Sequence, residues 1–237
     1  MIPQITEQVI AAAKASGAIV ILPGNVYNSG AEGGIWSQET PHRPVSRKDR
    51  IRVEMEAAYG LAGVQTIILR VGNFIDPEGQ GDIMSMFILR DISRGKIVGG
   101  GAPDVTQTWC YLPDWARAAE LLARMRADLP SFEDIPFPGH SFTLTDLRAQ
   151  LEEHLERSFR IVRFPWRLMT MAAPFWELAR ALREMRYLWD TPHSLSDRKF
   201  NRHLPDFRHT PVADVMLDSL SPVLRAVDQA DAMARSA

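Results

Sequence analysis

The sequence predicts an α/β fold in which helices cover both faces of a parallel sheet. Two near-continuous apolar strands, residues 18–22 and 64–70, alternate with helical segments. Strands buried on both faces have this composition, because helices on either side exclude water from them. Beyond Gly72 the pattern changes to short strands mixed with helices, which indicates a smaller α+β part after about residue 75.

The first elements follow from apolar spacing and end signals. The first 17 residues have the spacing of an amphipathic helix, and residues 18–22 form a buried strand directly after it. Residues 24–44 form a polar loop longer than usual connections, which suggests a site or a lid. A capping box, Ser46-x-x-Asp49, opens the next helix, and residues 64–70 form a second strand rich in β-branched residues.

The remaining elements are shorter. A second capping box, Thr143-x-x-Asp146, opens one of the later helices. The spacing predicts helices over 82–96, 114–127, 144–157 and 165–189, the last divided at Pro174, and strands over 96–101, 106–113, 133–139 and 159–165.

Composition excludes several classes of site. The chain of 237 residues has a formal net charge of −2, so no polyanionic partner is required. Cys110 is the only cysteine, so an intrachain disulfide is ruled out. We expect Cys110 to be a small, buried hydrophobic residue. The six histidines show no metal-binding spacing, so we expect no metal. No apolar run approaches the roughly 20 residues of a membrane span, and we expect a cytoplasmic protein.

Residues 157–190 are basic and aromatic. The segment contains seven arginines and three acidic residues, Glu177, Glu184 and Asp190, a net charge of 7 − 3 = +4. Among its aromatic residues, five are interleaved with the arginines: Trp166, Phe175, Trp176, Tyr187 and Trp189. A module that binds nucleic acid or a membrane surface has such a composition. We favour the simpler interpretation, in which the aromatic residues pack a small subdomain and the arginines face water. We therefore expect neither nucleic acid nor a membrane as a partner.

Known phosphate-binding and hydrolase motifs are not found in this sequence. The chain contains no G-x-G-x-x-G between a strand and a helix, no Walker lysine and no G-x-S-x-G elbow. The strand over 18–22 nevertheless runs into Pro23, Gly24 and Asn25, and ligands of open α/β sheets lie beyond such strand ends. His42 is the only histidine near the predicted strand ends, so it is a further site candidate.

Four segments resemble one enzyme family when read in order. These are "AAAKASGAIVILPGNVYNSG", "SRKDRIRVEMEAA", "VQTIILRVGNFIDP" and "TWCYLPDWARAAELL". They are similar to the middle and later parts of the extended short-chain dehydrogenases/reductases, the NAD-dependent epimerase/dehydratase-like proteins. The segment "PDFRHTP" resembles the closing segment of that family, so the resemblance covers nearly all of the chain.

The resemblance implies an incomplete Rossmann-like sheet. Residues 1–75 correspond to the C-terminal part of a Rossmann-like domain, and residues 76–237 to a substrate-type subdomain with segments that return to the core. The first βαβαβ unit of the family, roughly 80 residues long, has no counterpart here. A late start, a shortened gene product or completion of the sheet by another chain each fits this expectation. An open edge strand leads us to expect a homodimer or poor solubility.

The resemblance also implies a proton-transfer mechanism for which the usual residues are not found. The family uses a tyrosine phenol, a lysine four residues later and a serine hydroxyl. None of the four tyrosines here has a lysine at that distance. Counted back from Glu54, the tyrosine and lysine positions fall on Ser46 and Arg50, and the serine position falls near Pro23.

The resemblance assigns NAD or NADP to the two strand ends. By family position, the cofactor-binding candidates are Pro23, Gly24, Asn25, Val71, Gly72 and Asn73. The catalytic candidates are Asn25, His42, Ser46 and Arg50. We expect an NAD(P)-dependent epimerase/dehydratase or reductase-like protein with impaired or non-standard catalysis, acting on an unidentified small molecule. The alternative is a non-catalytic protein of the same fold that binds a nucleotide or a partner in a regulatory role.

Overall fold

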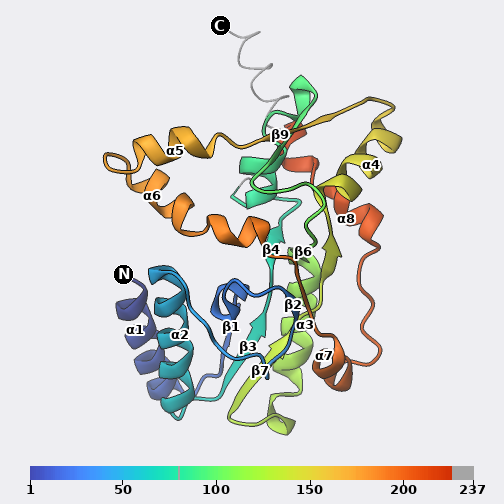
Figure 1. Ribbon diagram of the computed structural model, residues 1–237. Coiled ribbons are helices and arrows are strands. Elements are labelled where there is room, and N and C mark those ends of the chain that lie inside the picture. The colour runs from blue at the N-terminus through green and yellow to red at the C-terminus, as the bar shows by residue number, and fades with distance from the viewer. Residues whose placement is uncertain (80, 226–237) are drawn as a thin grey trace, which may run out of the picture.

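The computed structural model describes residues 1–79 and 81–225, and it has an α/β architecture (Figure 1). The helices are α1 (Ile2–Ser16), α2 (Arg47–Leu61), α3 (Leu112–Arg124), α4 (Leu144–Leu155), α5 (Trp166–Ala172), α6 (Glu177–Glu184), α7 (Arg198–His203) and α8 (Val212–Asp218). The strands are β1 (Val20–Leu22), β2 (Gly34–Trp36), β3 (Thr66–Arg70), β4 (Asn73–Ile75), β5 (Lys96–Gly99), β6 (Gln107–Tyr111), β7 (Phe132–Pro136), β8 (His140–Phe142), β9 (Arg160–Arg163) and β10 (His193–Leu195). Short 3-10 or π turns are η1 (Val26–Ser29), η2 (Met84–Ile88), η3 (Ile92–Arg94), η4 (Arg126–Asp128) and η5 (Arg186–Asp190).

The main sheet is parallel, with the order β1-β3-β7. All five residues of the central strand β3 are buried, as the apolar run over 64–70 predicts. The chain leaves this sheet after β3 and returns to it through α3 and β7, so the first and second parts of the chain share one core.

Helices cover both faces of this sheet. On one face Leu22 and Ile68 pack against Met55 and Tyr59 of α2, and α1 lies beside α2 (Figure 1). On the other face Ile67 and Leu69 join a core with residues of α3 and α7. Successive strand residues point to opposite faces, so this division follows directly from the strand alternation. The predicted fold class is confirmed.

The second part of the chain has its own core around two small sheets. Strands β4 and β6 pair in parallel, β8 joins β6 antiparallel, and β5 pairs with β9. This core contains η2 together with α4 and α8, and α5 and α6 project beside it as a helical hairpin (Figure 1). No helix of the described residues is long and apolar enough to cross a membrane.

Both predicted capping boxes are present. The hydroxyl of Ser46 accepts the backbone N–H of Asp49, whose carboxylate accepts the N–H of Ser46. Thr143 and Asp146 make the same pair of bonds at the start of α4. Each box satisfies N–H groups that have no partner inside the helix, which fixes where the helix begins.

The predicted helix over residues 82–96 is wrong. The structure has the single π turn η2 and the 3-10 turn η3 there. Met84, Phe87, Ile88 and Leu89 are buried in the second core, whereas Met86 is 63% exposed. Tertiary packing of this kind overrides local helix preference.

The long polar loop is more ordered than expected. It contains η1 and β2, and β2 pairs in parallel with β10 near the C-terminal part of the chain. Trp36 of β2 stacks on His193 of β10, with their ring centroids 4.6 Å apart. The loop is therefore fixed to the second part of the chain by a strand pair that its sequence did not reveal.

The basic aromatic segment divides into two parts. Trp166, Tyr187 and Trp189 are half-buried, as the packing interpretation predicts. Phe175 and Trp176, at the turn between α5 and α6, are 94% and 48% exposed, so the expectation that all five aromatic residues pack inside is wrong for these two.

Candidate functional site

The predicted strand-end residues lie side by side. Beyond β1 the carbonyl of Gly24 accepts the N–H of Val71, at 3.0 Å, and Asn25 forms a parallel bridge with Val71. The two glycines are required by close packing here. A Cβ on Gly24 would lie 2.4 Å from Cγ2 of Ile68, and one on Gly72 would lie 2.0 Å from the carbonyl oxygen of Thr108. Gly24 thus brings the end of β1 against β3, and Gly72 brings the end of β3 against β6.

Asn25 presents an amide group at this edge. Its Oδ1 accepts the backbone N–H of Tyr27 at 3.0 Å and so caps η1. Its Nδ2 is buried and has no hydrogen-bond partner among the described residues. A buried donor without a partner costs free energy, which is regained when a ligand accepts from it.

A cavity of about 600 Å³ opens beyond these strand ends. Such a volume is in the range that small-molecule and cofactor sites occupy. Its walls come from the loops after β1 and β3, from η2 and from the α5–α6 hairpin. The lining residues are Tyr27, Asn73, Phe74, Gly81, Asp82, Ile83, Met86, Phe87, Arg90, Phe164, Pro165, Met169, Trp176, Leu178 and Leu182.

A smaller cavity of about 60 Å³ adjoins the first, because Tyr27, Asn73 and Ile83 line both. Gln107 and His193 are the other polar residues that line it. The Nδ1 of His193 lies 2.8 Å from the carbonyl oxygen of Thr191, and its Nε2 is buried without a partner among the described residues. Burial lowers the pKa of His193 and raises the pKa of Tyr27, so both side chains are neutral near pH 7.

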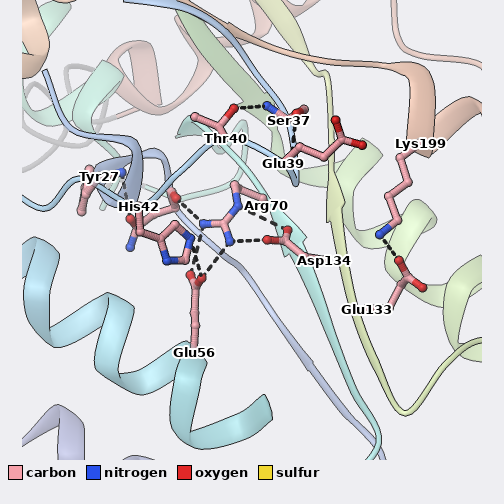
Figure 2. A network of polar contacts seen from close by, with 11 residues as sticks. Tyr27, Ser37, Glu39, Thr40, His42, Glu56, Arg70, Glu133, Asp134 and Lys199 are labelled. Atoms are coloured by element: carbon pink, nitrogen blue, oxygen red, sulfur yellow. Dashed lines mark hydrogen bonds and ion pairs between the residues drawn. The ribbon is translucent and has the colours of Figure 1, made fainter. Parts of the chain in front are cut away.

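A buried ion-pair network lies beneath the site (Figure 2). Arg70, the last residue of β3, donates to Glu56 at 2.7 Å, to Asp134 at 2.6 Å and to the backbone carbonyl of Asn25 at 2.7 Å. Burial lowers the pKa of Arg70, but the carboxylates of Asp134 and Glu56 outweigh that effect and raise it overall. The network therefore stays charged and joins α2, β3 and β7 to the turn that carries Asn25.

The predicted catalytic candidates do not converge on the cavity. Ser46 is buried, and its hydroxyl is engaged in the capping box with Asp49, 2.5 Å from Oδ1. The phenol of Tyr187 donates to the same carboxylate at 2.9 Å. The side chain of Arg50 is exposed, and Nε2 of His42 lies 3.9 Å from Glu56. Asn25, His42, Ser46 and Arg50 are all outside the cavity lining, and of the predicted cofactor-binding residues only Asn73 belongs to it.

Two polar residues of the site escaped the sequence-based reasoning. Gln107 lies in β6, and His193 lies in β10, far along the chain from the loop that follows β1. Neither residue occurs in a sequence motif. His193 reaches the site only because β10 pairs with β2. Within residues 1–79 and 81–225, no group of acidic, histidine and cysteine side chains is arranged to hold a metal ion.

The fold is shared with known oxidoreductases and epimerases. A UDP-glucuronic acid 4-epimerase from Bacillus cereus, solved with UDP-glucuronic acid and NAD, matches with a TM-score of 0.74 and 13% identity, over 94% of this chain and 67% of that chain. An L-threonine dehydrogenase from Phytophthora infestans matches with a TM-score of 0.71 and 18% identity, over 94% and 70%. A UDP-galactose 4-epimerase matches with a TM-score of 0.67 and 14% identity, over 93% and 68%.

No family model matches this chain, and no curated protein sequence matches it. The structural likeness is therefore one of fold at identities of 13% to 18%. It confirms the predicted resemblance to the NAD-dependent epimerase/dehydratase fold.

Proposed function

We propose that this chain binds NAD or NADP at the carboxyl ends of β1 and β3, as an oxidoreductase- or epimerase-like protein with impaired or non-standard catalysis. The observation that carries the proposal is the meeting of two strand-end loops beside a cavity of about 600 Å³. Ligands of open α/β sheets bind in this position. The shared fold supports it, since two of the matching proteins were solved with NAD and a nucleotide sugar.

The residues present suit the nicotinamide end of such a cofactor. The Nδ2 of Asn25 is a buried donor without a described partner, and a carboxamide oxygen is a suitable acceptor for it. Asn73 lines the cavity from the neighbouring loop. When bound, the nicotinamide supplies hydride transfer.

The proposal of non-standard catalysis rests on the surroundings of Ser46 and Arg50. A serine hydroxyl exchanges its proton far less readily than a phenol, and a guanidinium does not deprotonate in proteins. Moreover, the hydroxyl of Ser46 is bonded within the start of α2. Tyr27, which lines the cavity, is the remaining phenol at the site, and burial raises its pKa, so it acts as a donor and not as a base.

A second candidate function is binding without turnover. The placement of Ser46, Arg50 and His42 outside the cavity lining favours it. A protein of this kind would use the same strand-end site to sense a dinucleotide and to signal through a partner. The two candidates differ in turnover and agree on binding.

Calorimetric titration with NAD, NADH, NADP and NADPH tests the proposal. We expect binding of at least one pair, together with a rise in melting temperature. The informative variant is Asn25→Asp, which keeps the acceptor that caps η1 and loses the Nδ2 donor. We expect it to weaken binding by about 10-fold, the loss of one buried hydrogen bond with a charged oxygen added.

The matched control is Asn201→Asp on α7, an exposed position outside the cavity lining. It should bind the cofactor as the unchanged chain does. No heat and no thermal shift at millimolar concentrations of all four dinucleotides would overturn the proposal. Binding with hydride exchange to no carbonyl or sugar substrate would favour the second candidate.

A further inference from the structure

The walls of the large cavity are almost entirely apolar. The hairpin and the segment before it contribute Phe164, Met169 and Leu182, and η2 contributes Phe87. Phosphates and sugars are recognised by several charged or hydrogen-bonding groups that converge on them. Hydrocarbon and aromatic surface instead gains free energy by excluding water from a ligand that is itself apolar.

The two charged residues of the lining are already engaged within the protein. The carboxylate of Asp82 accepts the N–H and the hydroxyl of Ser85, both at 2.9 Å. The Nε of Arg90 lies 3.3 Å from the carboxylate of Asp91. The two charges have opposite signs, so together they add no net charge to the lining, and Asp91 engages only the Nε of Arg90 among its donors.

Large apolar side chains are exposed where this cavity opens. Met86, Trp176 and Leu178 are 63%, 48% and 52% exposed, and all three line the cavity. A cluster of exposed apolar residues around one opening is typical of a ligand-binding groove. A bound apolar molecule would cover them.

The inner end of the cavity is polar but uncharged. Tyr27 and Asn73 line the passage into the smaller cavity, where Gln107 and His193 are found. No acidic or basic side chain of the described residues lines that smaller cavity. The Nε2 of His193 has no partner there, and within residues 1–79 and 81–225 no hydrogen bond engages the phenol of Tyr27. An uncharged oxygen fits such a group of neutral donors and acceptors.

We propose that the substrate of this site is a ketone or alcohol with a long hydrocarbon or aromatic body. The body lies between η2 and the α5–α6 hairpin, and the oxygen lies at Tyr27 and Asn73. This inference rests on the proposed function and gives it a substrate class. It separates the chain from the matching proteins that were solved with nucleotide sugars.

Displacement of a neutral fluorescent probe tests this inference. N-phenyl-1-naphthylamine gains fluorescence when it enters an apolar cavity, and we expect saturable binding of one probe per chain. An uncharged ketone such as 2-undecanone should displace it. Undecanoate, with a charged head, should be weaker by about 10-fold, because burying an unpaired carboxylate is costly. UDP-glucose should not displace the probe at all.

Two matched variants locate the probe. Leu178→Glu places a charge on the cavity wall and should weaken probe binding by about 10-fold or more. Met171→Glu changes a residue of the same hairpin that is 75% exposed and lies outside this cavity, and it should change binding by less than about twofold. Equal losses in the two variants would show adsorption to the hairpin surface and would overturn the inference.

A third variant tests the polar end. Tyr27→Phe removes only the phenol oxygen, so we expect displacement by 2-undecanone to weaken by about 2- to 12-fold, the effect of one hydrogen bond. Binding of the probe itself should not change. Displacement that is unaffected by this variant would contradict the placement of the oxygen.

Failure of this inference about the substrate can be distinguished from failure of the proposed function. If a dinucleotide binds by calorimetry while the probe does not bind, or UDP-glucose displaces it, the substrate class is wrong and the proposed function stands. If the probe and ketone bind as expected while no dinucleotide binds, the cavity takes this class of ligand and the proposed function is wrong.

Discussion

Arg70 shows how one buried residue organises the site. It is 3% exposed, and it holds two carboxylates from different elements together with the backbone carbonyl of Asn25. Its fork of donors matches this geometry, because a guanidinium can serve several oxygens in one plane. The position of Asn25 therefore depends on a charge pair that is not itself in the cavity lining.

Replacement of Arg70 tests this role. Arg70→Met leaves Glu56 and Asp134 close together without a cation, so we expect the free energy of unfolding to fall by about 3–5 kcal/mol. The control is Arg124→Met, which breaks the exposed pair with Glu120 and should cost less than about 1 kcal/mol. Urea denaturation measures both, and similar losses in the two variants would contradict the account.

His193 gives the molecule a dependence on pH. Burial lowers its pKa in the folded state below the ordinary value of about 6.5. The unfolded chain then binds the proton more tightly, so the stabilisation is complete above about pH 6.5 and is lost as the pH falls through the folded pKa. His140 and His209 are shifted downward by burial as well.

The melting temperature should therefore fall as the pH is lowered below about 6.5. His193→Gln should reduce this slope, because the titrating group is removed from its place beside Trp36. His154→Gln, at an exposed position on α4, should leave the slope unchanged. Circular dichroism measures the melting temperature of the three proteins at each pH. Equal slopes of melting temperature against pH would show that His193 does not contribute.

Only part of the candidate site could be predicted from the sequence. Pro23, Gly24 and Asn25 follow directly from a strand end, and Val71 lies beside them because parallel strands end together. His193 was not found, since strand pairing between distant segments leaves no local pattern. Ser46 and Arg50 came from counting along a helix, and whether they act in catalysis stays a prediction.

At the level of elements, the start of α2 shows how local signals and long-range contacts combine. The capping box at Ser46 is visible in the sequence, and the structure confirms it. Asp49 is also fully buried and accepts the phenol of Tyr187 at 2.9 Å. This carboxylate therefore connects α2 with the turn η5, a contact that no local pattern predicts.

The two capping boxes make a matched pair of variants. Asp146→Asn changes an exposed box and should cost about 0.5–2 kcal/mol, the usual worth of a cap. Asp49→Asn also disturbs buried bonds from Ser46 and Tyr187, so we expect a further loss of about 1–3 kcal/mol. Equal unfolding free energies in urea would show that the contact with Tyr187 adds nothing.

The elements that the sequence predicts well are those with one clear apolar pattern. Strand β3 and helices α1 to α4 have such patterns, and the structure contains them. The segment over 82–96 has helical spacing, but part of it packs into the second core while Met86 is exposed, and its backbone forms only the short turns η2 and η3. Strand β2, only three residues long, gains its partner from β10 and cannot be recognised from its own residues.

At the scale of the whole molecule, the chain crosses between the two cores more than once, and these crossings link them. Strand β7 returns to the main sheet, and β10 returns to the long loop after β1. The predicted division near residue 75 describes where the pattern changes, and the returning segments make the two parts one packed unit (Figure 1). The cavity lies between elements from both parts.

Strand β1 is an edge of the main sheet in the described residues, where it pairs with β3 alone. Unpaired edges favour association with another strand, so we expect a homodimer in which β1 meets the same strand of a second copy. Light scattering after size exclusion should give twice the chain mass. A stable monomer at all concentrations up to about 100 μM, in the range where weak dimers form, would contradict this expectation.

The central claim is that the ends of β1 and β3 form a dinucleotide site, and NMR of ¹⁵N-labelled protein titrated with NADH tests it most directly. The side-chain amides of Asn25 and Asn73 report on the proposed site, and that of Asn201 reports on a distant surface. We expect the first two signals to move saturably, together with the backbone signals of Gly24 and Gly72, while the signal of Asn201 stays in place. No movement of the Asn25 and Asn73 signals at saturating NADH, or movement confined to other parts of the chain, would contradict the account.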